Sequence, residues 1–150
     1  MGTELRLQDY LPHRLSVASN AVSRLIARSY ELRFGLKIAQ WRLIAVLADE
    51  GPLTPQALCA RTIMDKVRVM RAAQGLLDRG LLSRQPNPED GRSHRLALTR
   101  SGTRLHRDIV PWALACEARL LQGLTRADIL RLDTLLRRLQ KRAAGADIVK

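Results

Sequence analysis

Residues Asp65 to Leu98 read DKVRVMRAAQGLLDRGLLSRQPNPEDGRSHRLAL, and this stretch decides the expected fold. Asp65 suits a helix N-cap, because its carboxylate can accept hydrogen bonds from the free N–H groups of the first turn. The following residues recur with the 3.6-residue period of a helix. One apolar face is defined by Val69, Ala72, Ala73 and Leu76. The pattern predicts an amphipathic helix, and Gly80 fits the position that ends it.

The remaining sides of this helix carry cations and longer side chains. They are Lys66, Val67, Arg68, Met70, Arg71 and Gln74. Small residues on the buried face allow a helix to sit close to its neighbours. Cations on the opposite face, with side chains that can reach base edges, suit a helix that lies in a DNA major groove.

A basic two-stranded hairpin is predicted directly after this helix. Its strands are Leu81–Arg84 and Arg95–Leu98, and the QPNPEDGRSH between them holds residues that turns favour. We expect the tip to project and to carry Arg92 and His94 outward. An arginine on a thin loop can enter a minor groove, where the negative potential attracts it. The alternative is that the Asp-Gly pair merely makes a turn and that Arg92 is solvated.

Composition limits the class of protein and of partner. The 150 residues are 46% hydrophobic, enough for one domain with a core. The formal charge of +12 and the pI near 11.3 indicate a polyanionic partner, either nucleic acid or an acidic membrane surface. A coding bias toward arginine could produce part of this charge, so composition is weak evidence on its own.

Catalytic and metal-binding patterns are missing from the sequence. Cys59 and Cys116 are far apart within helical patterns, without the spacing of zinc ligands, so we expect reduced thiols that pack as small apolar residues. The three histidines, His13, His94 and His106, have no partners that suggest a triad, and no glycine-rich phosphate loop occurs. We expect no enzyme activity, no metal and no cofactor. Without a secretory signal or a long apolar run, we expect a cytoplasmic protein with no membrane association.

The residues before the hairpin predict three more helices. A long helix from Asp9 to Gly35 carries an apolar seam with 4-3 spacing: Leu11, Leu15, Ala18, Val22, Leu25, Ser29 and Leu32. A buried helix is expected over Ile38–Ala48. A short one is expected over Pro55–Arg61, with Thr54 as its N-cap. The short helix and the basic one after it make a helix-turn-helix.

Two further helices are predicted after the hairpin. One runs from about Thr99 to Gly123 with Pro111 in its interior, and the other is capped by Thr125 and runs to about Ala143. The apolar faces of the first and last helices have little local structure to cover them. A two-fold dimer buries them most economically. The alternative is a monomer that folds its terminal helices onto the reading head, which is the predicted helix-turn-helix with its hairpin.

The order of these parts resembles the MarR family of bacterial transcription regulators over about residues 10–143, most strongly from Leu47 to Gly102. The run RGLLSRQPNPEDGRSHRLALT is similar to that family's helix end, its wing with Asp-x-Arg near the tip, and the Leu-Thr start of its next helix. The expected fold is mainly α, as a single domain of residues 1–150. It would comprise a winged helix-turn-helix at about 36–103 with a small β-hairpin wing, and dimerisation helices at about 9–34 and 104–143.

The resemblance implies a homodimer that binds a pseudo-palindromic operator in double-stranded DNA, usually as a repressor. By position, Arg92 would be the minor-groove arginine and Asp90 the acid that orients it. The major-groove or phosphate contacts would fall to Lys66, Val67, Arg68, Met70 and Arg71. Met70 departs from the small polar residue often found there, and apolar contact with a thymine methyl is one use for it.

The resemblance also implies release of DNA by a small, often aromatic and acidic, effector. Family members that respond to ligands keep their pocket between the first, second and fifth helices. In that neighbourhood we nominate Tyr10, His13, Arg14 and Trp41, which offer a cation, an imidazole and rings. The alternative is that Trp41 belongs to the core and that His13 and Arg14 are solvated.

Other functions make different predictions. A sequence-indifferent, basic architectural nucleic-acid-binding protein would bind any duplex with similar affinity, whereas a regulator would prefer one operator. A protein-interaction adaptor that had lost DNA binding would lack basic residues on the wing and on the predicted recognition helix, which is the basic helix after Asp65. This chain has basic residues on both.

Overall fold

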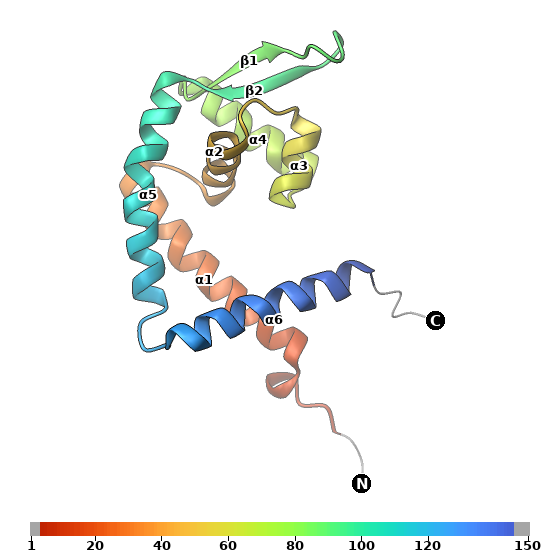
Figure 1. Cartoon of the computed structure of the whole chain (residues 1–150), viewed down its shortest axis with the longest axis vertical. Helices are drawn as coiled ribbons and strands as arrows, with labels where there is room; N and C mark the ends of the chain where they lie inside the picture. Colours follow the sequence, from red (N-terminus) through yellow and green to blue (C-terminus); the bar gives the residue numbers. More distant parts are fainter. Residues whose placement is uncertain (1–3, 146–150) are drawn as a thin grey trace. The chain divides into compact units, whose positions relative to one another are not determined.

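The computed structural model describes residues 4–145 (Figure 1). The elements follow in the order η1 (Leu7–Asp9), α1 (Leu11–Phe34), α2 (Ile38–Glu50), α3 (Pro55–Thr62), α4 (Lys66–Asp78), β1 (Leu82–Pro86), β2 (His94–Leu98), α5 (Arg100–Leu120) and α6 (Arg126–Gly145). The expected mainly helical fold with one β-hairpin is therefore confirmed. Of the described residues, 4–111 form one compact unit and 112–145 another. The boundaries expected for the dimerisation helices stay a prediction.

The first long helix begins at Leu11, two residues later than expected. Residues Leu7–Asp9 form a separate 3-10 turn, and Tyr10 is the N-cap in an extended conformation. Gly35 ends α1 with a φ of 62°, a left-handed conformation that glycine adopts without steric cost. Most of the predicted seam of α1 is exposed in the single chain, with Leu11 57% and Leu25 56% exposed.

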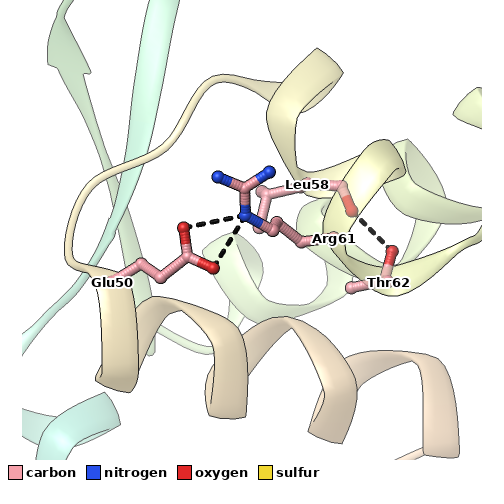
Figure 2. Close-up of polar contacts among 4 residues, drawn as sticks. All are labelled: Glu50, Leu58, Arg61 and Thr62. Atoms are coloured by element: carbon pink, nitrogen blue, oxygen red, sulfur yellow. Dashed lines mark hydrogen bonds and ion pairs between the residues drawn. The ribbon is translucent and has the colours of Figure 1, made fainter. Parts of the chain in front are cut away.

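The core of the first unit is formed by side chains of α2, α3, α4, β2 and α5 and by Leu36. Its largest fully buried side chains are Leu36, Leu43, Ile44, Leu58, Val69, Leu76, Leu96 and Ile109. Helix α2 continues to Glu50, two residues beyond the expected end, and Glu50 accepts from Nε of Arg61 at 2.8 and 2.9 Å (Figure 2). This ion pair joins the C-terminal ends of α2 and α3.

The hairpin is longer than expected, and its second strand also pairs with the loop before α3. Its antiparallel register runs from Leu82 opposite Leu98 to Pro86 opposite His94. In the loop before α3, Leu53 exchanges two backbone hydrogen bonds with Leu96, at 3.1 and 2.8 Å. The base of the hairpin is thereby fixed to the helix-turn-helix.

The second unit consists of the end of α5 and α6. Thr125 and Asp128 form the predicted capping pair: the Asp128 N–H donates to Thr125 Oγ1 at 3.1 Å, and Asp128 Oδ2 accepts from the Thr125 N–H at 3.0 Å. Hydrogen bonds from the Thr125 hydroxyl and N–H lower the pKa of Asp128. Helix α6 has no buried residue. None of the helices within residues 4–145 has the length and apolar character needed to span a membrane.

The turn between α3 and α4 contains a strained residue. Ile63 has a φ of 54° and is the only non-glycine residue with positive φ among residues 4–145. A β-branched residue in this region is a steric outlier. Its side chain is 77% exposed, so core packing does not compensate for the strain.

We therefore predict that Ile63→Asn raises the free energy of unfolding by about 1 kcal/mol, because asparagine tolerates the left-handed conformation. Chemical denaturation of the two proteins would measure the difference. A less stable Ile63→Asn protein would show that the isoleucine side chain makes stabilising contacts that outweigh the strain.

Candidate nucleic-acid interface

Helix α4 is formed and ended as the sequence predicts. Asp65 accepts a hydrogen bond from the Arg68 N–H at 2.8 Å. At the other end, the N–H groups of Gly80 and Leu81 donate to Leu77 O and Leu76 O, each at 2.9 Å, and Gly80 has a φ of 67°. This is the Schellman arrangement, and it satisfies carbonyls that would otherwise lack donors. The predicted apolar face is confirmed, since Val69, Ala72, Ala73 and Leu76 are all buried.

Arg79 ties the end of α4 to the end of α1. Its guanidinium donates to Gly35 O at 2.9 Å and to Phe34 O at 3.3 Å. These carbonyls lie at the C-terminus of α1, where a cation also compensates the helix dipole. The contact therefore fixes the C-terminal end of α1 to the C-terminal end of α4.

The outer face of α4 carries positive charge without compensating partners. Lys66, Arg68 and Arg71 are exposed, and within residues 4–145 their side chains form no hydrogen bond or ion pair. Gln74 is engaged, since its amide donates to Asp78 at 2.7 Å and accepts from Arg84 at 3.4 Å. The outer face therefore offers cations to a polyanion without having to break internal salt bridges.

A network of short-range hydrogen bonds shapes the wing tip, and Figure 1 shows the tip reaching away from the helices. Asp90 Oδ1 accepts from the backbone N–H of Arg92 at 3.0 Å, and Asn87 Nδ2 donates to Ser93 Oγ at 2.7 Å. Asp90 thus positions the backbone of Arg92. The Arg92 guanidinium is exposed and has no partner among the residues that the structure describes. The turn-forming role and a DNA-binding role are therefore compatible.

His94 does not project outward at the tip, which corrects one expectation. It begins β2 opposite Pro86, where its side chain is half-buried. Its Nε2 atom is buried and has no hydrogen-bond partner in the described part of the chain. His94 lines a cleft of about 870 Å³ among α3, the start of α4 and the hairpin, together with Met70 and Arg92. Cys59 also lines this cleft and is half-buried, so it is not the core residue we expected.

The four nominated effector residues do not form one site. Trp41 stacks on Tyr30, with ring centroids 5.4 Å apart, and on His106 at 5.8 Å. His13 lies near the other end of α1, in a pocket of about 470 Å³ lined also by Arg6, Leu7 and Gln8. At a rise of about 1.5 Å per residue, His13 and Tyr30 are roughly 25 Å apart along the helix. Tyr10 and Arg14 flank His13, so Trp41 is separate from all three.

A family model described as the MarR family matches residues 34–93. This match covers the helix-turn-helix and the wing up to the residue after Arg92. Residues 34–93, two fifths of the chain, are thus similar to the MarR family.

Two curated mycobacterial proteins are similar to this chain. An uncharacterised HTH-type transcriptional regulator of Mycobacterium leprae is 34% identical over 92 residues, 58% of this chain and 62% of that protein. An uncharacterised protein of Mycobacterium tuberculosis is 29% identical over 134 residues, 81% of this chain and 93% of that protein. The chain thus spans somewhat less than two thirds of the curated regulator's length.

Among solved structures, a MarR/EmrR family regulator from an Acinetobacter species superposes with a TM-score of 0.86 at 22% identity, covering 95% of this chain and all of that one. A probable transcriptional regulator from Pseudomonas aeruginosa gives 0.82 at 28% identity, covering 89% and 99%. The Mycobacterium leprae and Pseudomonas aeruginosa proteins are named as transcription regulators, a class of protein that is not enzymatic, in agreement with the prediction of no enzyme activity.

Sequence reasoning missed two contacts that position the candidate interface. Arg79 and the carbonyls it binds are 44 and 45 residues apart, and Leu53 pairs with Leu96 across the whole helix-turn-helix. Neither contact leaves a periodic pattern in the sequence. A leucine between Pro52 and Thr54, half-buried in the structure, is the only local signal for the second.

Proposed function

We propose that the chain is a homodimeric, sequence-specific transcription regulator that binds a pseudo-palindromic operator and acts as a repressor released by a small effector. The observation that carries this proposal is the set of cations without internal partners on two exposed elements of one unit. These are Lys66, Arg68 and Arg71 on α4 and Arg92 at the wing tip.

The two elements suit different grooves of one duplex. An α-helix fits the major groove, where side chains distinguish all four base pairs, and an exposed arginine on a thin loop suits the minor groove. The alternative of sequence-indifferent binding is not favoured, because the curated relatives are named as transcriptional regulators. A further relative, 23% identical, is named the transcriptional repressor IacR of Pseudomonas putida, which supports repression.

A second copy of the chain is the proposed partner of the apolar surface of α6. Leu132, Leu135, Leu136 and Leu139 recur with helical spacing, and each is 40–44% exposed. Burial of such a stripe would stabilise an assembly by about 25 cal/mol per Å² of apolar surface. Two-fold symmetry would also supply two reading heads for a palindromic operator.

An aromatic acid is the effector class that the relatives suggest. A solved structure of a Bordetella bronchiseptica protein concerns regulation of DNA binding by 6-hydroxynicotinic acid, and one from Streptomyces coelicolor contains its natural ligand. Both are below 25% identical to this chain. Trp41 and the residues around His13 lie apart, so they do not share one effector site within the single chain.

We predict that Arg92→Ala weakens binding to the operator, identified by in vitro selection from random duplexes, by about 1 to 3 kcal/mol. The circular dichroism spectrum should not change, because the side chain is exposed and unpaired. Titration in a gel-shift assay would measure the loss. Arg137→Ala on α6, where the arginine pairs with Asp133, removes the same charge and serves as the control. Equal losses for both variants would indicate a general charge effect and would refute the wing contact.

We predict that Leu135→Glu converts the dimer to a monomer and abolishes high-affinity operator binding, because two charges would be buried against an apolar face. Sedimentation velocity would measure the assembly state. Leu130→Glu provides the matched control, since Leu130 is 60% exposed on the opposite side of the same helix. A Leu135→Glu protein that remains dimeric would exclude the α6 stripe from the interface.

We also predict that an aromatic acid raises the melting temperature of the protein and lowers its operator affinity by the same binding event. A thermal-shift screen followed by gel-shift titration in the presence of each hit would test both effects. Hits that stabilise the protein without changing operator affinity would contradict the proposed release.

A further inference from the structure

One apolar side chain stands on the outermost row of the recognition helix. Buried Val69, Ala72, Ala73 and Leu76 fix the inner face of α4. With about 100° of rotation per residue, the row opposite to them contains Val67, Arg71, Gln74 and, in the last turn, Asp78. Val67 is 67% exposed, so it contributes little to the core.

The other members of this row have polar or charged side chains, whereas the side chain of Val67 is apolar. Arg71 carries an unpartnered guanidinium, and the amide of Gln74 already bonds Asp78 and Arg84. Val67 lies in the first turn of α4, between Lys66 and Arg68. The N-terminal residues of a recognition helix are those that approach base edges most closely. The neighbouring cations make a polyanion the natural occupant of this surface.

Only one apolar group lines the major-groove edge of the four bases, and it is the 5-methyl group of thymine. We propose that Val67 packs on a thymine methyl group and so selects thymine at one position of each operator half-site. This inference rests on the proposed function, and it names a specificity-determining residue within that function. The contact needs no hydrogen bond, which matches a side chain that can form none.

The test replaces each thymine of the selected operator in turn by deoxyuridine, which lacks only the methyl group. One replacement per half-site should weaken binding of the parent protein about three- to fivefold, the effect of burying about one methyl group. The Val67→Ala variant should bind the thymine operator more weakly than the parent protein does, by a similar factor. It should bind the thymine and deoxyuridine operators with equal affinity. Alanine favours helix more than valine, so the variant should remain folded.

Ile63→Ala is the matched control, because it removes another exposed apolar side chain just before α4, off the outward row. This variant should retain the full deoxyuridine penalty. The inference is overturned if no deoxyuridine replacement weakens binding, or if the penalty persists in Val67→Ala. A selection that yields no preferred sequence would instead overturn the proposed function, and the inference with it.

Discussion

The close packing of two alanines decides which side of the recognition helix is free. Ala72 and Ala73 lie on the inner face of α4 between the larger Val69 and Leu76, and all four are buried. Small side chains let α4 approach α2 and α3, and this contact fixes the rotation of the helix about its axis. The rotation then dictates that Val67, Arg71 and Gln74 face outward. Larger residues at the two alanine positions would push the helix from the core and would tilt the cationic face with it.

Polar contacts at both ends of α4 hold this orientation and extend it to the wing. Thr99 Oγ1 donates to Gly80 O at 2.7 Å, and the Thr99 N–H donates to Leu81 O at 3.1 Å, so the base of the hairpin is bonded to the end of α4. Gly102 packs beneath Leu81 O, where a Cβ atom would collide with that carbonyl. Because the wing and the helix share these bonds, the Arg92 tip and the α4 face are presented as one surface. A duplex can then be contacted in two grooves without a large loss of conformational entropy in the wing.

Local patterns in the sequence were enough to predict the helices and the hairpin. The caps at Asp65, Thr54 and Thr125 and the glycine stops are short-range signals, and the structure places them as expected. Exposure of Lys66, Arg68 and Arg71 followed from the helical period alone. Contacts over long sequence separations could not be predicted, and the bond from Arg79 to the end of α1 is the main example. The four nominated effector residues were chosen by helix, and α1 is long enough that Trp41 packs near one of its ends and His13 lies near the other.

The side on which a residue lies was harder to predict near the wing tip. His94 sits at the boundary between turn and strand, and a shift of one residue there exchanges the outer and inner sides. Arg92 lies within the turn and not in a strand, where Asp90 accepts from its backbone N–H and its side chain is exposed.

Hydroxyl-radical footprinting of the selected operator with the full chain is the most direct measurement of whether the outer face of α4 and the wing tip bind duplex DNA as a pair of reading heads. The account predicts two protected patches on one side of the duplex, about one helical turn apart, with their flanks protected by the wings. Uniform protection along the duplex, or a single protected half-site, would contradict it.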